Sequence, residues 1–342
     1  MKKYSLDRYS RQMYFQPIGE EGQKKIFNSK VTLIGCGALG SIIANNLVRS
    51  GVGELKIIDR DFIEKNNLQR QILFDEKDIK QNLPKAIAAQ KKLSKINSEV
   101  KISAYVDDVT HQNIEFFIKD SNLVMDGSDN LYVRFLINDT CVKLNKPWIY
   151  SAVISSYGYT LPIIPYKTPC LRCYFPDLPP AGTMETCDIV GIISPVINII
   201  ASYSTVEAFK ILTGNFNNLC TNLLALDVWD RSFDHIPLIR QNNCICCEQN
   251  NFEFLQGEKE QRIVSLCGRD TIHISGVENA CISLDELAKK LEKQGTVNYN
   301  QYMLKFMVDN YELIIFPNAR AIIKGTNDKF VAKKLYGKYV GY

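Results

Sequence analysis

Short apolar runs alternate with amphipathic segments through the first half of the chain. Val31–Ile34 and Leu55–Ile58 are apolar runs of strand length, and the residues between them carry apolar side chains at helical spacing. The same alternation continues with helices near 84–96, 111–118 and 131–142 and with strands near 100–106, 122–126 and 148–154. Strands that alternate with helices predict an α/β fold with a mainly parallel, doubly wound sheet. The ligand of such a sheet binds at the carboxyl ends of the strands.

Later segments extend this sheet and then form a second, smaller domain. Tyr157–Ile164 predicts an antiparallel addition to the sheet, and Leu223–Trp229 predicts a further strand. After a polar linker at 248–261, Ser283 and Glu286 form a capping box at the start of a helix. Three short strands and a last helix follow, near 302–308, 311–316, 321–324 and 329–339. We therefore expect a first domain over 1–248 and a small α+β domain over 262–342.

A glycine-rich loop separates the first strand from the first helix of the sheet. The residues that we expect to approach a ligand there are Gly35, Gly37, Ala38, Leu39 and Gly40. Glycines at the first, third and sixth positions allow a tight turn and close approach of phosphate to the helix N-terminus. Asp59 ends the second strand, where an acid can accept hydrogen bonds from ribose hydroxyls. The stretch predicts a Rossmann-like nucleotide site, and the usual interpretation of such a loop is a dehydrogenase.

Composition narrows the class of protein. The chain has 342 residues, of which 46% are hydrophobic and 23% are charged, as in an ordinary globular protein. Its net charge of +4 is too small to indicate nucleic acid as a partner. The N-terminus lacks the apolar core of a secretory signal. The long apolar stretch at 189–211 contains proline and polar residues, which favours a buried helix over a membrane span. We therefore expect a cytoplasmic protein without a membrane segment.

The cysteines are the unusual part of the composition. There are eleven, and in a reducing compartment metal binding explains them better than disulfides do. Two Cys-x-x-Cys pairs, Cys170 with Cys173 and Cys244 with Cys247, each present two thiols from one turn. Together they have the ligands of a closed, structural zinc site. Cys246 leaves a second register open for the later pair, although the two-residue spacer favours Cys244 with Cys247. Four unrelated buried thiols are the alternative interpretation.

Charged and polar residues come after the glycine loop in the sequence, and we expect them at the carboxyl ends of the strands, where the ligand binds. They are Asp59, Asn67, Arg70, Lys85 and Asp129. Lys85 comes directly after Pro84 at the start of a predicted helix, where a cation opposes the helix dipole, which indicates that it faces an anion. Cations that neutralise developing charge and an acid that holds magnesium suit phosphoryl or nucleotidyl transfer, whereas a dehydrogenase does not need them. Surface salt bridges are the alternative for any single member of this set.

With these residues considered together, the sequence resembles the ThiF/MoeB/HesA adenylyltransferases, the bacterial relatives of ubiquitin-activating enzymes. The resemblance covers residues 4–247. Its motifs are RYSRQ at 8–12, GCGALG at 35–40, IIDRDFIEKNNLQRQ at 57–71, LPKA at 83–86, DGSDN at 126–130, CLRC at 170–173, EAFKILTG at 207–214 and CICC at 244–247. The tail resembles the extra domain of bacillus-type members and has no assigned role. Ala38 and the pair Gly127-Ser128 depart from the commonest pattern by small-for-small exchanges, and we expect ATP binding to survive them.

The resemblance implies a role for each matching residue. The implied nucleotide contacts are Gly37 and its neighbours, Asn67, Arg70 and Lys85 for the phosphates, Asp59 for the ribose, and Asp129 for Mg²⁺. Arg11 is expected to reach across a two-fold homodimer into the site of the partner subunit. Asp61 and Asn130 adjoin these positions and complete the set of candidate nucleotide-binding residues.

The implied reaction is adenylation of a ubiquitin-like sulfur carrier protein of the ThiS or MoaD type. The carboxylate of its terminal Gly-Gly attacks the α-phosphate of ATP and releases pyrophosphate. This nucleophile is ionised at pH 7 and needs no general base, which agrees with the absence of histidine from the motifs. Cys187 lies where relatives carry a cysteine that can accept the activated carrier. A covalent role and a dispensable loop thiol are both open interpretations.

Three alternatives stand beside this prediction. Other members of the family activate a peptide terminus or a modified tRNA base, and the two cysteine pairs with the loop at Thr186-Cys187 argue against the tRNA type. An NAD-dependent oxidoreductase would share the glycine loop, but Arg70, Lys85 and Asp129 argue against it. A scaffold that binds nucleotide without catalysis is the third. The sequence does not separate thiamine-thiazole from molybdopterin biosynthesis.

Overall fold

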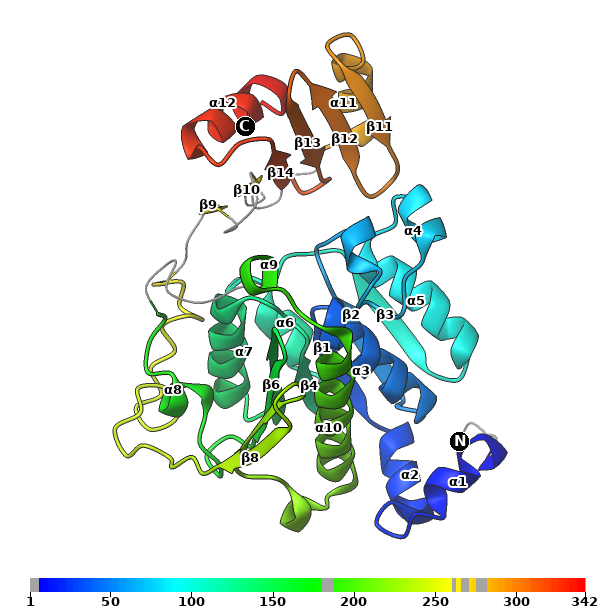
Figure 1. Ribbon diagram of the computed structural model, residues 1–342, viewed down its shortest axis with the longest axis vertical. Coiled ribbons are helices and arrows are strands. Elements are labelled where there is room, and N and C mark those ends of the chain that lie inside the picture. The colour runs from blue at the N-terminus through cyan, green and yellow to red at the C-terminus, as the bar shows by residue number, and fades with distance from the viewer. Residues whose placement is uncertain (1–5, 180–186, 260–262, 266–270, 275–281, 342) are drawn as a thin grey trace. The chain divides into compact units, whose positions relative to one another are not determined.

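The computed structural model describes residues 6–179, 187–259, 263–265, 271–274 and 282–341. The chain divides into two compact units, Met1–Glu258 and Lys259–Tyr342, and each contains its own sheet. The sheet of the first unit has the order β3-β2-β1-β4-β5-β6-β7-β8 (Figure 1). Its strands are β1 (Lys30–Ile34), β2 (Glu54–Ile58), β3 (Lys101–Tyr105), β4 (Leu123–Asp126), β5 (Trp148–Ile154), β6 (Tyr157–Ile163), β7 (Leu223–Asp227) and β8 (Ser232–Ile236).

The pairing of these strands confirms the predicted fold class. The strands β3, β2, β1, β4 and β5 are parallel, and β6, β7 and β8 extend the sheet through antiparallel pairs. The chain leaves β1 toward β2 and β3 on one side and returns to β4 and β5 on the other. In doubly wound sheets ligands bind where the strand order reverses, beyond the carboxyl ends of the strands. Here that place lies between Ile34, at the end of β1, and Asp126, at the end of β4.

Helices cover both faces of this sheet and enclose two apolar cores. They are η1 (Leu6–Tyr9), α1 (Ser10–Met13), α2 (Gly19–Phe27), α3 (Ala38–Arg49), η2 (Lys65–Asn67), α4 (Glu76–Lys80), α5 (Lys85–Ile96), α6 (Ile114–Ile118), α7 (Leu131–Lys143), α8 (Leu171–Tyr174), α9 (Cys187–Val190), α10 (Ser194–Thr213) and η3 (Phe216–Asn218). One core joins the sheet to α3, α5 and α10. The other joins the opposite face to α6, α7 and the cysteine turns (Figure 1). Alternate strand residues point to opposite faces, so both cores draw on the same strands.

The long apolar helix begins later than its apolar run suggests. Helix α10 starts at Ser194, with Pro195 in its first turn, and ends at Gly214, which has a φ of +85°. Residues 187–190 form the separate short helix α9, and Gly191, with a φ of +76°, lies between the two helices. A left-handed glycine interrupts a right-handed helix, and proline suits a first turn, so the two helices stay separate.

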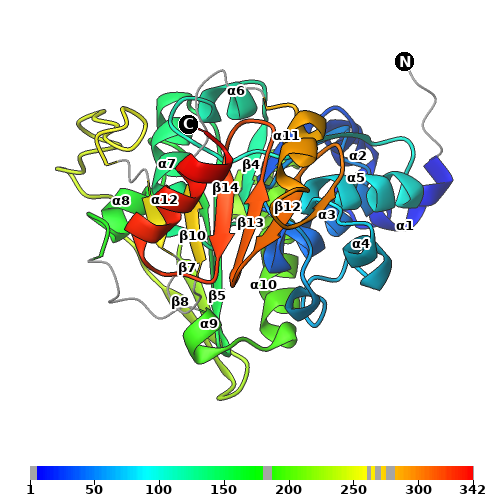
Figure 2. The same cartoon turned by 90° about the horizontal axis from the view of Figure 1, so that it is seen from above.

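Among its described residues the second unit has a six-stranded antiparallel sheet and two helices, which confirms the α+β class. Its order is β11-β12-β13-β14-β10-β9. The elements are β9 (Ile263–Ser265), β10 (Thr271–Ile274), α11 (Leu284–Leu291), β11 (Thr296–Tyr299), β12 (Leu304–Val308), β13 (Tyr311–Ile315), β14 (Ala321–Lys324) and α12 (Lys329–Tyr339). Three of these strands were predicted, and β9, β10 and β11 were not. Both helices pack on one face of this sheet and share one apolar cluster with it (Figure 2). The Oγ of Ser283 accepts from the N–H of Glu286, which is the predicted cap of α11.

Candidate nucleotide site and cysteine cluster

The glycine loop between β1 and α3 is packed backbone against backbone. A β-carbon on Gly40 would lie 2.1 Å from the carbonyl oxygen of Gly35, and one on Gly35 would lie 2.6 Å from the carbonyl oxygen of Gly127. Gly35 also has a φ of +86°, in the left-handed region that favours glycine. The loop after β1 and the loop after β4 therefore touch directly at the point where the strand order reverses.

The first turn of α3 is open to an anion. Gly37 occupies the N-cap position and offers no side chain to the N–H groups of the turn. Uncapped N–H groups and the helix dipole together bind phosphate. Leu39 is buried in the core beneath the loop, so it presents only its backbone to a ligand. Ala38 is half-buried and lies at the start of the helix.

Asp59 is fixed beside the loop by two backbone donors. The N–H of Cys36 donates to its Oδ2 at 2.6 Å, and the N–H of Asp61 donates to its Oδ1 at 2.7 Å. The side chain is buried, and burial raises the pKa of Asp59, while the charge of Lys85 opposes this rise. The structure thus places an acid at the end of β2, in contact with the glycine loop.

Lys85 is a buried cation at the start of α5. Its Nζ lies 3.0 Å from Oδ2 of Asp61, and its backbone N–H donates to the carbonyl of Asp61. Burial by itself lowers the pKa of Lys85, but the carboxylates of Asp61 and Asp59 outweigh burial and raise it. Lys85 therefore stays charged at neutral pH, and the anion that it faces in this structure is Asp61.

The loop after β4 is anchored by Arg134. Its Nε donates to Oδ2 of Asp126 at 2.9 Å, and its Nη2 donates to the carbonyl oxygens of Ser128 and Ser151. Asp129, on the same loop, is exposed, and its charge acts on Lys85 and on Arg134. Asn130 caps α7, because its Oδ1 accepts from the first N–H groups of that helix. Asp129, the residue expected to hold magnesium, is thus exposed on this loop.

Asn67 and Arg70 are engaged within their own turn. The Oδ1 of Asn67 accepts from the N–H of Glu64, and its Nδ2 donates to the side chain of Asn66. The guanidinium of Arg70 donates to the carbonyl of Asn66 at 2.7 Å. Contacts of these two side chains thus stay local among the residues that the structure describes. The structure brings Asp59, Asp61, Lys85 and Asp129 within electrostatic reach of one another.

Two other predicted residues lie outside this cluster. Arg11 is exposed on α1, and in the described part of the chain its guanidinium contacts the ring of Tyr14, 5.6 Å from the centroid. Cys187 begins α9, and its side chain lies outside the described residues. Sequence reasoning gave no role to Arg60, which follows Asp59 and forms ion pairs with Asp61 and Asp108. The run of charges after β2 was the available signal for it.

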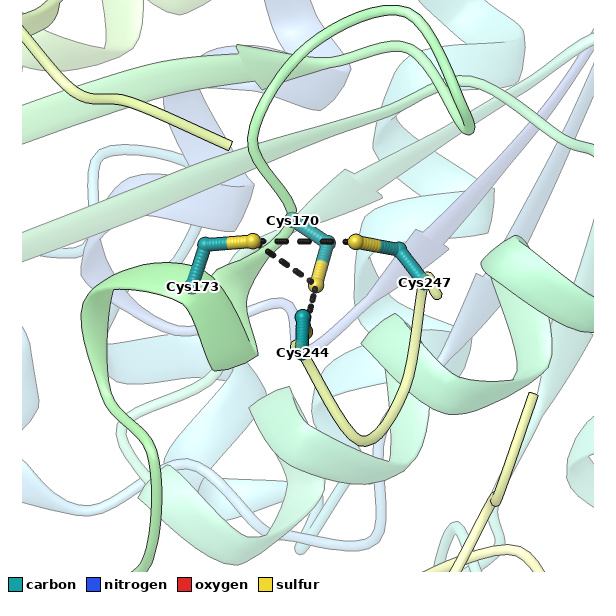
Figure 3. Close-up of side chains that lie close together, drawn as sticks. All are labelled: Cys170, Cys173, Cys244 and Cys247. Atoms are coloured by element: carbon teal, nitrogen blue, oxygen red, sulfur yellow. Dashed lines mark hydrogen bonds between the residues drawn. The ribbon is translucent and has the colours of Figure 1, made fainter. Parts of the chain in front are cut away.

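The four paired cysteines converge on one point (Figure 3). Their sulfur atoms all lie within 4.8 Å of one another, with separations of 3.9 Å for Cys170–Cys173, 3.6 Å for Cys170–Cys244 and 3.6 Å for Cys173–Cys247. Four sulfurs around tetrahedral zinc, at a Zn–S distance of about 2.3 Å, are roughly 3.8 Å apart. The residues present therefore fit a closed metal site.

Helix α7 holds both cysteine turns. The Nδ2 of Asn138 donates to Sγ of Cys246 at 3.2 Å, and its Oδ1 accepts from the N–H of Leu171 at 2.8 Å. Asp139 accepts from the N–H of Phe254 at 3.0 Å, in the segment after the second turn. Cys246 is buried against this helix and is not among the four clustered sulfurs. The register that the structure shows therefore pairs Cys244 with Cys247.

Comparison with known proteins agrees with this geometry. A family model described as "ThiF family" matches residues 9–247. The chain is 40% identical over 338 residues to the sulfur carrier protein ThiS adenylyltransferase of Bacillus subtilis, which covers 98% of this chain and 99% of that protein. It is 34% identical over 251 residues to the sulfur carrier protein adenylyltransferase of Thermus thermophilus, covering 72% of this chain and 92% of that protein.

Solved structures show the same fold. The structure of E. coli MccB with ATP superposes with a TM-score of 0.63 at 24% identity, over 72% of this chain and 76% of MccB. Within the described residues, no helix has both the length and the apolar character needed to span a membrane. Because the family model matches most of the chain and one relative matches nearly all of it, this chain belongs to the ThiF family.

Proposed function

We propose that this adenylyltransferase activates the terminal Gly-Gly carboxylate of a ubiquitin-like sulfur carrier protein of the ThiS or MoaD type, for thiamine-thiazole or molybdopterin biosynthesis. The observation that carries the proposal is the buried Lys85 cation near Asp59 and the uncapped glycine loop. A cation in that position serves transfer of a phosphate-bearing group, and hydride transfer does not require it. The Bacillus subtilis relative, named for adenylation of ThiS, matches along the whole chain and favours a ThiS-type carrier.

In the proposed reaction a carboxylate oxygen of the carrier attacks the α-phosphorus of ATP. A bond forms between that oxygen and phosphorus, and the bond from phosphorus to the bridging oxygen of the β-phosphate breaks. Its electron pair leaves with pyrophosphate, and no proton moves, because the nucleophile is an anion at neutral pH. The chain therefore contributes position and charge neutralisation, for which Lys85, Arg70 and the first turn of α3 are suited.

The Lys85–Asp61 ion pair is arranged so that a phosphate can open it. The side chain of Lys85 is 9% exposed, whereas that of Asp61 is 41% exposed, so an incoming anion meets the pair from the Asp61 side. Until then Asp61 keeps the ammonium in place and charged. On this proposal Lys85 turns from Asp61 to a phosphate oxygen, and Asp59 accepts from the ribose hydroxyls.

The metal ions have separate places in this proposal. Mg²⁺ usually binds through one or two carboxylates together with substrate phosphates, and it neutralises phosphate charge. Asp129 has an exposed carboxylate on the loop that touches the glycine loop, which suits that role. We assign zinc to Cys170, Cys173, Cys244 and Cys247, where a closed set of sulfurs would hold the first unit together.

An exposed apolar surface favours protein partners. Ile199, Tyr203 and Val206 are exposed along one side of α10, and the ring of Tyr203 lies 5.6 Å from that of Phe233 on β8. Strand β8 is exposed along its whole length. Contiguous apolar surface of this kind marks interfaces between proteins. We propose that a homodimer covers it and brings Arg11 of one copy to the nucleotide site of the other. Partial recovery of activity on mixing Arg11→Ala with Asp129→Asn protein is the expected result.

Carrier-dependent exchange of pyrophosphate into ATP tests the proposed function. The protein is incubated with ATP and Mg²⁺, and with a ThiS-type carrier, a MoaD-type carrier or a carrier that lacks its last two glycines. Exchange with one intact carrier and none with the truncated form is expected. Absence of exchange with both intact carriers, or reduction of a substrate by NADH, would overturn the proposal. Cys187→Ser should leave exchange intact, and an adduct lost in that variant would assign it a covalent role.

A further inference from the structure

One acid at the candidate nucleotide site lies between two cations. The Nζ of Lys85 is 3.0 Å from Oδ2 of Asp61, and the Nε of Arg60 is 3.7 Å from Oδ1 of the same carboxylate. The Nη1 of Arg60 donates to Oδ2 of Asp108 at 2.9 Å. The four side chains therefore form one chain of alternating charge, in which each oxygen of Asp61 faces a different cation.

The two cations hold Asp61 unequally. At 3.0 Å the ammonium of Lys85 is within hydrogen-bond distance of Asp61, whereas the Nε of Arg60, at 3.7 Å, lies beyond it. Arg60 is anchored from a neighbouring loop, because Asp108 follows β3 and Arg60 follows β2, and these two strands are paired in parallel. Lys85 is thus the closer partner of Asp61 in this structure, and Arg60 is a second partner already in place.

The proposed reaction takes the closer partner away from Asp61. When Lys85 turns to a phosphate oxygen, Asp61 keeps its negative charge while a triphosphate enters beside it. Like charges at short range repel one another, and water screens them less where the groups are partly buried. Without a second cation Asp61 would oppose the same ligand that Lys85 binds.

Negative charge is already in excess around these two cations. More carboxylates than cations make up the group whose charges act on Lys85 or Arg60, and these carboxylates are Asp59, Asp61, Asp108 and Asp129. Loss of Arg60 would increase that excess before a nucleotide arrives. The second cation therefore matters most for a ligand that is itself an anion.

An ion pair on α5 shows an ordinary structural arrangement. The Nζ of Lys92 lies 2.7 Å from Oδ2 of Asp75 and also pairs with Asp78, and these two acids form the capping box at the start of α4. One cation there serves two acids, and no proposed step disturbs it. The side chain of Lys92 is 28% exposed and that of Arg60 is 26% exposed, so Lys92 provides a matched control.

We propose that Arg60 is a positioning residue for the nucleotide, which keeps Asp61 neutralised after Lys85 has turned to phosphate. The inference rests on the proposed function, because it takes ATP as the ligand and Lys85 as the cation that moves. A planar guanidinium suits this role, since separate nitrogens face Asp61 and Asp108, whereas an ammonium presents a single nitrogen. In this role Arg60 acts through Asp61 and makes no contact with the base.

The coupling between Arg60 and Asp61 tests this assignment. Dissociation constants for ATP and for adenosine are measured at pH 7 in Arg60→Met, in Asp61→Asn and in the double variant. Arg60→Met should weaken ATP binding by on the order of tenfold, because Asp61 then repels the phosphates. In the Asp61→Asn background the same change should cost less than about threefold, since the charge that Arg60 compensates is gone. Adenosine, which has no phosphate, should bind wild type and all three variants equally.

Two further variants separate this role from a purely structural one. Arg60→Lys keeps the charge, so it should recover part of the lost ATP affinity, and its remaining loss should also disappear in the Asp61→Asn background. Lys92→Met, the control, should leave ATP affinity unchanged. An equal loss of ATP affinity in both backgrounds, or no loss in either, would overturn the assignment. A weaker adenosine affinity in Arg60→Met would overturn it too, because Arg60 would then contact the nucleoside.

The affinities are measured without any carrier, which keeps this inference apart from the proposed function. The expected coupling together with no carrier-dependent exchange would overturn the proposed function and leave the role of Arg60 standing. Carrier-dependent exchange together with unchanged ATP affinity in Arg60→Met would overturn the role of Arg60 alone.

Discussion

The first unit contains two candidate sites that are built in opposite ways. At the cysteine cluster four sulfurs converge on one point from two turns, and all but Cys173 are buried (Figure 3). At the nucleotide site the charged groups pair with one another, Lys85 with Asp61 and Arg134 with Asp126, while the first turn of α3 has no side-chain cap. The cluster is a closed set of four sulfurs whose arrangement fits one metal ion. The candidate nucleotide site is a set of ion pairs beside a helix turn without a side-chain cap.

This difference teaches which site serves the fold and which serves the ligand. Converging thiolates repel one another without a cation, so on our proposal an ion bound there would contribute directly to folding. Ion pairs within the candidate nucleotide site satisfy its charges in this structure, and on our proposal the ligand replaces some of those contacts. Variants at the cysteine cluster should therefore lose stability, whereas variants at the candidate nucleotide site should lose activity.

The largest separation is expected from Asp129→Asn. The side chain is exposed on the loop after β4, so stability should stay within about 0.5 kcal/mol of wild type. Loss of a magnesium carboxylate should lower exchange by on the order of a thousandfold. Paired thermal melts and exchange assays measure both, with the exposed Asp120→Asn as a control that changes neither. A large fall in the melting temperature of Asp129→Asn would show that this residue serves stability, against the proposed difference between the two sites.

Cys244→Ser should give the reverse result. Removing one of four converging sulfurs should cost at least about 3 kcal/mol, or roughly 6–12 °C in Tm for a unit of this size. Metal content should fall from one ion per chain toward zero, measured by elemental analysis after gel filtration. Cys246→Ser is the matched control, because its sulfur lies outside the cluster and a serine can still accept from Asn138. Retention of one ion by Cys244→Ser, together with loss of the ion from Cys246→Ser, would show that Cys246 and not Cys244 binds the metal.

A smaller effect should follow from Asn138→Leu. Asn138 bonds to both cysteine turns from α7, and loss of such supporting bonds typically costs tenfold to a hundredfold in metal affinity. Competition with a chromophoric chelator measures this, with Asn198→Leu on α10 as a control. ATP affinity should not change. A weaker ATP affinity in metal-loaded Asn138→Leu would mean that α7, which begins beside Asp129, couples the two sites.

The cysteine cluster could be predicted from the sequence because spacing alone restricts it. Two thiols from one tight turn can serve one ion whatever the surrounding fold, and Cys246 was the single ambiguity. The nucleotide site was predicted from the glycine loop and Asp59, but the roles of Asn67 and Arg70 in that site depended on a family resemblance, since their chemistry cannot be derived from their spacing. The partners that these residues take in the structure, Glu64 and Asn66, belong to their own turn. The sequence alone does not show whether a ligand replaces such local hydrogen bonds or leaves them in place.

Two of the strands that escaped prediction share a physical cause. Strands β8 and β11 have no buried face to produce alternation, because Ser232–Ile236 is exposed throughout and Thr296–Tyr299 nearly so. The start of α10 was placed too early because its apolar run continues through Gly191. The buried Oε1 of Gln71 has no hydrogen-bond partner among the described residues, and no sequence pattern could indicate this, because hydrogen-bond satisfaction exists only in three dimensions.

The smallest predicted effect isolates the Lys85–Asp61 pair through pH. Asp61 and Asp59 raise the pKa of Lys85 against the effect of burial, so in wild type the cation should persist beyond the ordinary lysine value of about 10.4. A lysine is charged below its pKa, and Asp61→Asn removes the larger raising influence. The charged fraction of Lys85 should then fall as pH rises through a lower pKa, and ATP affinity should fall with it by roughly threefold to tenfold between pH 7 and 10. The ATP affinity of wild type should not change over that pH range. The control is Asp75→Asn, which breaks an ion pair of Lys92, a second lysine on α5, and its ATP affinity should not change either. Identical flat profiles in wild type and Asp61→Asn would show that Lys85 does not depend on Asp61 for its charge.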